Sequence, residues 1–331
     1  MKLYAPVDAD SLIDEVLRIC GTTAAVYSNK AIVSRVNNAL DRYYEIIRQA
    51  TRQWSADDSG QSSPPIETQN LVSGTNRYKF SSFTSEILDL LRLEVLDSNG
   101  KGIGLIPESF DDLGLLIGNA SGKLSGITAS SFQELYLNAP AGQPYYYAKY
   151  GNFVYLRDNP NYNYTAGLKA YFNRPFVKYS FVTCTVTAAT DLVNATAHGL
   201  AANDAVIFET DTTIPAGITA DTTVYYVISS GLTVDVFKVS TTIGGSTIDI
   251  TDTGTGNHKF LKVSASPGIP SIHHPYLARY AALPFLIEKK LPHAGNIAQQ
   301  IQTDEFLIKN FYATRGKDLR PILTVRYENN R

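Results

Sequence analysis

The sequence predicts an α+β fold, in which helical N- and C-terminal parts enclose a β-rich middle and a further all-β domain is inserted. Three observations lead to this prediction. Amphipathic helical patterns are confined to the two ends, short β-like runs separated by turn residues fill the middle, and the composition changes near residue 183. We expect a helical hairpin (1–60), a β-rich core segment (61–182), an inserted sandwich or barrel (183–263), and C-terminal helices with a tail (264–331).

The N-terminal segment is predicted to form two helices. Asp10 or Ser11 can cap a first helix that ends near Gly21. A second, longer helix is expected over 28–54, where there is neither Pro nor Gly. Its apolar stripe follows a spacing of three and four residues and is broad enough for more than one packing partner. The stripe contains Ile32, Val36, Ala39, Leu40, Tyr43, Tyr44, Ile46, Ile47, Ala50 and Trp54.

The β-rich segment begins after a polar loop that ends in two prolines. We expect one hairpin between 70–72 and 77–80 and another at Asn99-Gly100, a strong turn signal. A third joins 145–150 to 153–157. Alternation predicts two half-buried strands, which place Leu91, Leu93 and Val95, and Leu168, Ala170 and Phe172, on their inner faces. Helical turns at 110–117 and a Gly- and Ser-rich loop at 119–131 are also expected.

The inserted segment is rich in Thr, Asp, Gly and Val and has no helical pattern. It carries eight acidic residues against three basic ones over 183–262. Its short β-like runs are spaced as in a small sandwich or barrel. They are 184–188, 205–208, 224–228, 234–239, 247–250 and 258–263.

Helical patterns return after the insert. The first predicted helix covers 271–290, with Pro275 in its first turn and a kink at Pro284. The second covers 294–314, and we expect its apolar residues Ile297, Ile301, Leu307, Ile308 and Phe311 to make packing contacts. The natural partner of both is the long N-terminal helix. The last residues are strand-like and then polar.

Bulk properties exclude several protein classes. The formal net charge is −2, so a strongly basic nucleic-acid binder is not indicated. Cys20 and Cys184 are far apart, which predicts two free thiols and synthesis in a reducing compartment. The N-terminus does not resemble a signal peptide, and no stretch is apolar enough to span a membrane.

No catalytic, cofactor or metal site is predicted, and we expect a protein that is not an enzyme. His273 and His274 are adjacent in a helical stretch, so their side chains diverge by about 100° and do not readily chelate one ion. We expect one of the two to be packed and the other exposed. His198 is expected to hydrogen-bond its own turn. The glycines at 100–104 lack the spacing of a phosphate-binding loop.

Two groups of residues are typical of binding surfaces but also have ordinary explanations. Arg35 and Arg42 share one face of the long helix, where they can contact DNA or belong to a solvated surface. The tyrosine clusters at 43–44, 145–147 and 225–226 can stack on sugars, but such pairs more often face a core and an interface.

The order of elements resembles the head-to-tail adaptor (neck or connector) proteins of tailed bacteriophages, over about residues 10–180 and 266–331. The insert resembles a β module of phage structural proteins, through 197–200, 204–208, 214–218, 224–228 and 248–252. The adaptor resemblance is carried by Arg52-Gln53-Trp54, Pro65-Ile66-Glu67-Thr68, Tyr78-Lys79-Phe80, Leu91-Arg92-Leu93-Glu94-Val95, Asp97-Ser98-Asn99-Gly100, the run Leu168 to Pro175 and the run Pro267 to His274.

The resemblance implies a virion protein that forms a closed ring of about twelve copies between the portal and the tail. Its partners would be the portal, tail or neck proteins and the DNA in the channel, with no membrane and no cofactor. The long helix and the C-terminal helices would carry the ring and portal contacts, the β middle would face the tail, and the insert would project outward. Interface candidates on the long helix are then Tyr43, Tyr44, Ile47 and Trp54.

Two alternatives remain open. The chain can be a tail or baseplate component whose inserted domain binds a host glycan or another virion protein. An enzyme acting on cell-wall sugars is the third hypothesis, but no residue pattern supports it.

Overall fold

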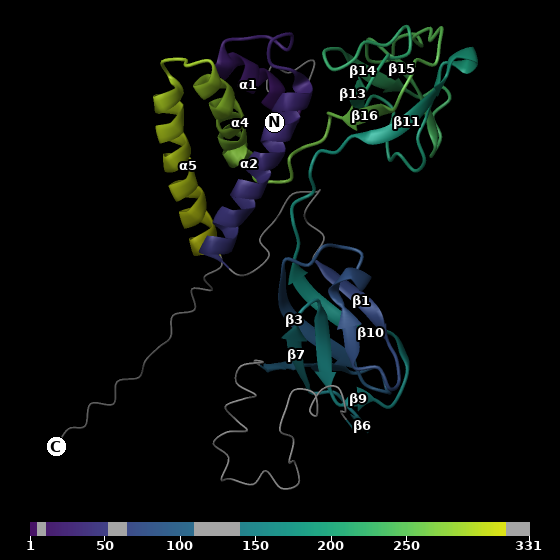
Figure 1. The fold of residues 1–331 in the computed structure, drawn as a ribbon, viewed down its shortest axis with the longest axis vertical. Helices are drawn as coiled ribbons and strands as arrows, with labels where there is room; N and C mark the ends of the chain where they lie inside the picture. Colours follow the sequence, from purple (N-terminus) through teal and green to yellow (C-terminus); the bar gives the residue numbers. More distant parts are fainter. Residues whose placement is uncertain (5–10, 52–64, 109–139, 316–331) are drawn as a thin grey trace, which may run out of the picture. The chain divides into compact units, whose positions relative to one another are not determined.

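A computed structural model describes residues 1–4, 11–51, 65–108 and 140–315 (Figure 1). It confirms the mixed α+β class, with helices in the N- and C-terminal parts and a β-rich middle. The chain forms two compact units, one made of Met1–Ser62 with Phe176–Arg331 and the other of Ser63–Pro175. We call them unit 1 and unit 2. The predictions for 110–117, 119–131, Trp54 and the C-terminal tail lie outside the described residues.

Among its described residues, unit 1 contains the α-helices α1 (Leu12–Cys20), α2 (Asn29–Ala50), α4 (His274–Glu288) and α5 (Ala294–Arg315). Local capping explains where the first two begin. The Ser11 side chain accepts a hydrogen bond from the Asp14 amide, and that of Ser28 accepts one from the Ala31 amide. Gly21 ends α1 in the left-handed conformation (φ 62°) that glycine adopts without strain. The starts of both helices and the end of α1 confirm the predictions. The longer helix was expected to reach residue 54, but α2 ends at Ala50 because Thr51 is extended (φ −147°).

The helices share one hydrophobic core, and α2 packs on both α4 and α5. Tyr43 lies at its centre and is fully buried. Its hydroxyl is 2.5 Å from Nδ1 of His273 and 3.1 Å from the hydroxyl of Tyr312 on α5. The broad apolar stripe on α2 is therefore covered by other helices of the same chain.

The inserted segment is a closed six-stranded barrel, in the order β11-β12-β15-β14-β13-β16. The run 247–250 is not a strand, which corrects the sequence prediction. Ile250 is buried, but its amide donates to the Asp191 carboxylate rather than to a neighbouring strand. The strand β12 was missed because it has only three residues. The strands are β11 (Val182–Thr187), β12 (Leu192–Asn194), β13 (Ala205–Thr210), β14 (Val224–Ile228), β15 (Val236–Ser240) and β16 (His258–Lys262).

The barrel is attached to the helical part of unit 1 by apolar and polar contacts. Ile207, Leu261 and Val263 are buried in the same core as the helices. At the start of α2, the Asn29 side-chain amide donates to the backbone carbonyl of Asp221 at 2.7 Å. The neighbouring Lys30 forms an ion pair with Glu209 of β13 and donates its backbone amide to the Asp221 carboxylate.

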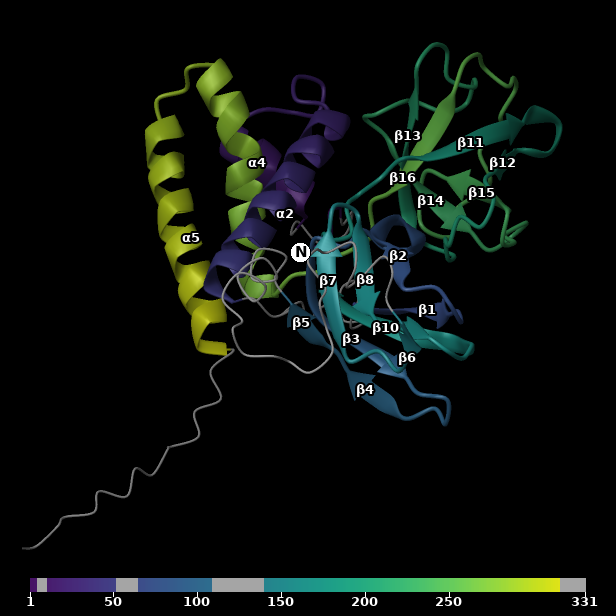
Figure 2. The ribbon, with the colours of Figure 1, turned by 60° about the horizontal axis from the view of Figure 1, so that its bottom comes forward.

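Unit 2 consists of two four-stranded sheets, in the orders β1-β10-β3-β4 and β2-β8-β7-β5, and a small β6-β9 pair (Figure 2). Leucine, valine and aromatic side chains from both sheets form its core. The strands of the first sheet are β1 (Ile66–Leu71), β3 (Asp89–Leu96), β4 (Gly102–Gly104) and β10 (Tyr164–Asn173). The others are β2 (Arg77–Lys79), β5 (Ile106–Glu108), β6 (Ala141–Gly142), β7 (Tyr146–Tyr150), β8 (Phe153–Arg157) and β9 (Asn159–Pro160).

Two of the three predicted hairpins in unit 2 are confirmed. β3 turns into β4 through Gly100 (φ 81°), and β7 turns into β8 through Gly151 (φ 56°). The hairpin predicted between 70–72 and 77–80 is wrong, because β1 pairs with β10 and β2 pairs with β8. The intervening turn carries the chain from one sheet to the other.

The prediction for β3 is correct at two positions and wrong at one. Leu93 and Val95 are fully buried, but Leu91 is 39% exposed and Leu90 is buried instead. A register shift in the pairing with β10 falls at this point, where Arg92 and Leu90 oppose consecutive residues. Such an extra residue reverses the alternation of faces along a strand. In β10, Leu168, Ala170 and Phe172 are buried as predicted.

Candidate functional site

The structure buries three of the four predicted interface residues. Tyr43, Tyr44 and Ile47 are 0%, 7% and 3% exposed and belong to the core of unit 1. This corrects the interface assignment, because side chains enclosed by their own chain do not present a surface to a second subunit. Trp54, the fourth, lies outside the described residues. The core also holds the two histidines of the 273–274 pair.

Both histidines are buried, with exposures of 9% and 3%, so the expectation that one is exposed is wrong. The short helical turn Ser271–His273 precedes α4, and His273 there meets Tyr43 of α2. His274 Nε2 lies 2.9 Å from the Ile269 carbonyl. His198 behaves as predicted, because the amide of Leu200 in its own turn donates to Nδ1 at 3.0 Å.

Of the two predicted DNA-facing arginines, Arg42 is engaged inside unit 1. Its Nε and Nη2 atoms donate to the two carboxylate oxygens of Glu305 on α5, both at 2.8 Å. It also reaches Glu45 one turn along α2, at 3.2 Å. The bidentate contact with Arg42 lowers the pKa of the Glu305 carboxyl. Arg42 thus clamps α2 to α5, whereas Arg35 is exposed and its predicted DNA contact stays a prediction.

The outward side of α5 carries large apolar side chains. Phe306 and Leu307 are 64% and 56% exposed, and Phe311 is 38% exposed while it also contacts His273. We call these three residues the α5 outer face. The opposite side of the helix is buried through Ile301, Ile308 and Tyr312. Leu307 was expected to make a packing contact, so its exposure corrects that prediction.

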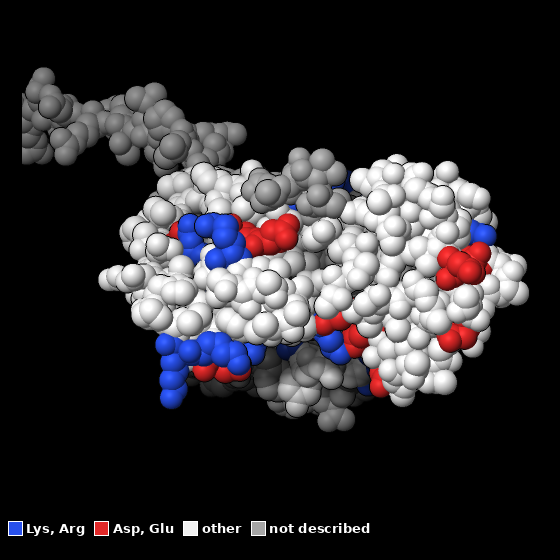
Figure 3. Space-filling view, turned by 90° about the horizontal axis from the view of Figure 1, so that it is seen from above, with Lys and Arg blue, Asp and Glu red and all other residues white. Residues whose placement is uncertain are grey.

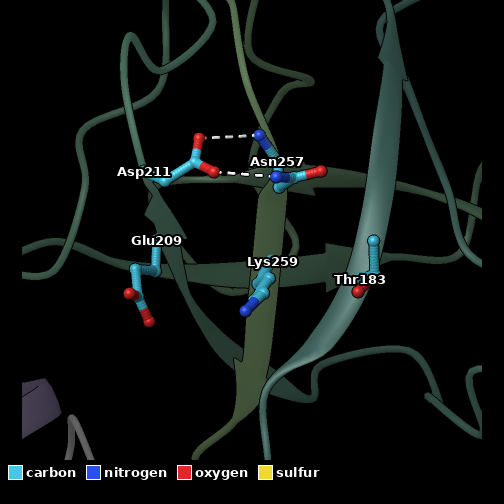
Figure 4. Close-up of a pocket in the computed structure, with 5 residues that line it drawn as sticks. All are labelled: Thr183, Glu209, Asp211, Asn257 and Lys259. Carbon is cyan, nitrogen blue, oxygen red and sulfur yellow. Dashed lines mark hydrogen bonds between the residues drawn. The ribbon is translucent and has the colours of Figure 1, made fainter.

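A small polar pocket lies on the wall of the barrel (Figure 4). It has a volume of about 130 Å³ and is lined by Thr183, Glu209, Asp211, Asn257 and Lys259. The Asp211 carboxylate accepts hydrogen bonds from the backbone amide and the side-chain amide of Asn257, at 2.8 and 2.7 Å. The first of these bonds is the main reason why the pKa of Asp211 lies below its usual range. The pocket can offer both a cation and carboxylates to a small polar group.

The described ranges of the chain contain neither a cluster of metal ligands nor a helix suited to cross a membrane. No group of three or more His, Cys, Asp or Glu side chains in them is placed to hold a metal ion. None of their helices combines the length and apolar character that a bilayer-spanning helix needs. Figure 3 shows one face of the molecule on which charged side chains form small clusters of mixed sign within a mostly uncharged surface.

Sequence reasoning missed the α5 outer face and the barrel pocket. Periodicity marks Leu307 and Phe311 as apolar, but it does not tell which apolar residues find a partner. The pocket is formed by residues from three strands that are remote in sequence. The chain matches no known family in a comparison with models of protein families, and a comparison with curated proteins also finds no match.

Proposed function

We propose that this protein is a structural, non-enzymatic component of a tailed-phage particle, and that it forms a ring that joins head to tail and extends the DNA channel. The observation that carries the proposal is the α5 outer face, where two consecutive large apolar side chains, Phe306 and Leu307, are both more than half exposed. The order of elements, which resembles that of phage adaptors, supports the same assignment. The resemblance assigns ring contacts to both the long helix and the C-terminal helices. Because the candidate residues on α2 are buried, our proposal keeps these contacts on α5 alone.

The α5 outer face is costly to leave in water. Phe306 and Leu307 are adjacent and both more than half exposed. Full burial of such a side chain contributes roughly 1.5–3 kcal/mol, so covering both by a neighbouring subunit favours association. Apolar surface of this kind on a folded protein is typical of an interaction site.

The dimensions of α5 suit one side of a subunit contact. The helix has 22 residues and is therefore about 33 Å long. A stable interface buries roughly 800 Å² on each partner, which a helix of this length supplies together with its neighbours. A ring needs a heterologous contact, in which the α5 outer face meets a different surface of the next copy.

The experiment changes the two exposed residues together. Wild-type protein, alone or with portal rings, is expected to give ring-shaped particles in negative-stain electron micrographs. The Phe306→Asp/Leu307→Asp variant should stay monomeric by light scattering, because two charges would have to be buried in the contact. Its circular dichroism spectrum and melting temperature should match the wild type, since both side chains are exposed in the monomer.

The matched control is Ser34→Asp/Asn38→Asp, which adds the same two charges at exposed positions of α2. It should assemble like the wild type. The proposal fails if the wild type remains monomeric with portal rings present and an antibody label does not locate it at the particle neck. It also fails in its structural detail if both double variants assemble normally.

One observation favours the second candidate, a tail or baseplate component whose barrel binds a glycan or a virion protein. The polar pocket on the barrel offers Lys259 and Glu209 beside the hydrogen-bonded Asp211 (Figure 4). Deleting 183–262 distinguishes the two roles. Intact particles that fail to adsorb to cells would support the second candidate, whereas filled heads that leak DNA or lack tails would support the first.

A further inference from the structure

The outer face of the β2-β8-β7-β5 sheet in unit 2 gathers cations and aromatic rings. The strand register defines which residues share this face. Lys79, Phe153 and Tyr150 oppose one another in one row, and Arg77 and Tyr155 begin the next. Side chains at these positions point away from the core of unit 2, because the alternate residues of the same strands fill it. Tyr155 is nevertheless buried at 6% exposure, so the open part of this face lies at Arg77 and Lys79. The third row contains Arg157, Tyr146 and Ile106.

Each of the three cations on this face lies over an aromatic ring. The Arg77 guanidinium is 4.8 Å from the centre of the Phe153 ring, and the Lys79 ammonium is 5.7 Å from the same ring. Arg157 lies 5.1 Å from the ring of Tyr146. These contacts hold flexible side chains in place. A cation that is already positioned loses less conformational entropy when it binds an anion.

Counted over the described residues, the face keeps a positive balance. Glu108 is the acidic residue that the register places on it, and the carboxylate accepts a hydrogen bond from Arg157 at 2.8 Å. Arg77 and Lys79 are both exposed. The outer face of the opposite sheet differs, because its Arg92 is paired with Glu94 at 2.5 Å. That face also carries Lys169, and its Arg92 lies 5.8 Å from the centre of the Tyr171 ring, so the two outer faces differ in their number of cations rather than in kind.

We propose that the outer face of the β2-β8-β7-β5 sheet, through Arg77 and Lys79, is a binding surface for the phosphate backbone of nucleic acid. Positioned cations complement a polyanion, and such contacts are independent of base sequence. The choice of nucleic acid among polyanions rests on the proposed function, which places DNA beside this protein. The surface differs from the predicted arginines of α2, one of which is engaged by Glu305.

The test measures how salt weakens the binding of two fluorescent probes to the full-length protein, a 20-base-pair duplex and a 20-nucleotide oligothymidine. Anisotropy titrations from 50 to 300 mM NaCl give the slope of log affinity against log salt. In Arg77→Gln/Lys79→Gln, two phosphate contacts are lost, so the slope should become shallower by about 1.8 for the duplex or about 1.4 for the single strand. The probe whose slope becomes shallower by its own full expected amount identifies the form of nucleic acid that is bound.

Two further variants make the result specific. Lys101→Gln/Lys169→Gln removes the same charge elsewhere in unit 2 and should leave the slope unchanged. Arg77→Lys/Lys79→Arg keeps both positive charges and should keep the salt slope of the wild type. A normal slope in this variant shows that the loss in Arg77→Gln/Lys79→Gln comes from the missing charges and not from misfolding. An equal loss in the Lys101/Lys169 variant, or no binding by the wild type at 50 mM NaCl, overturns the inference.

Assembly is recorded separately, by electron microscopy of the same preparations. A protein that forms rings but keeps its salt slope in Arg77→Gln/Lys79→Gln contradicts this inference and leaves the proposed function standing. A protein that never assembles, but whose salt dependence becomes shallower in this variant, supports this inference and contradicts the proposed function.

Discussion

Replacing Arg42 by alanine tests whether this residue clamps the helices together. Two hydrogen bonds from its guanidinium to Glu305 join α2 to α5, and Tyr276 of α4 donates to the same carboxylate at 3.3 Å. Hydrogen bonds to charged groups contribute roughly 1.5–3 kcal/mol when they are well shielded. Arg42 is 36% exposed, so solvent screening reduces our estimate to about 1–1.5 kcal/mol.

The expected result of Arg42→Ala is a melting temperature about 2–6 °C lower at pH 7, which follows from the usual shift per kcal/mol for a unit of this size. The assay is differential scanning fluorimetry, supported by circular dichroism. The matched control is Arg48→Ala, which removes the same side chain from an exposed position of the same helix. Its melting temperature should stay within about 1 °C of the wild type, as for most surface substitutions.

The stabilisation by Arg42 should also depend on pH. The pKa of Glu305 is lowered in the folded protein, chiefly by Arg42, so the carboxylate contributes stability above its unfolded value of 4.5. That contribution is lost as the pH falls below 4.5 and through the folded pKa. The difference between wild type and Arg42→Ala should therefore narrow in acid. Equal melting of the Arg42 and Arg48 variants, or a difference independent of pH, would refute the clamp.

Three further outcomes are expected. Burial raises the pKa of the Cys20 and Cys184 thiols to about 11 and about 12, so Ellman's reagent at pH 8 should label either only after unfolding; rapid labelling of native protein would contradict this. Phe237→Ala should lower the free energy of unfolding in urea by about 3–5 kcal/mol, because it empties the barrel core. Gly217→Ala should lower the free energy of unfolding by on the order of 1–3 kcal/mol in the same assay, since φ is +99° and the new Cβ would clash with the Asp249 carbonyl oxygen. Wild-type stability would refute the core position of Phe237 in the first variant and the strained, crowded position of Gly217 in the second.

Helix positions could be predicted from the sequence because their signals are local. Ser11, Gly21 and Ser28 act on backbone groups within a few residues, and the caps form as their positions indicate. The apolar stripe of α2 likewise predicted that the helix would be buried on a broad face. It did not reveal which surfaces would cover that face, since α4 and α5 follow more than 220 residues later.

Strand pairing was harder to predict because its partners are remote. The segments 70–72 and 77–80 look like a hairpin in isolation, yet the better partners of β1 and β2 are β10 and β8. The exposure of Leu91 follows from a bulge against β10, which no property of β3 alone specifies. The same limit applies to the binding surfaces. A sequence pattern identifies Phe306 as apolar and Arg77 as charged, but not the neighbours that leave one uncovered and hold the other over a ring.

Ion pairs between helices explain why α5 turns its apolar residues outward. Asp304 is paired with Arg279 of α4, and Glu305 with Arg42 of α2. These consecutive acidic residues flank the buried stripe of α5 and fix the rotation of the helix about its axis. The next two residues, Phe306 and Leu307, must then face away from the core. Arg42, one of the two arginines that suggested DNA binding, thus helps to orient the surface that we propose for assembly. Removing both ion pairs should weaken that assembly even where Phe306 and Leu307 are unchanged.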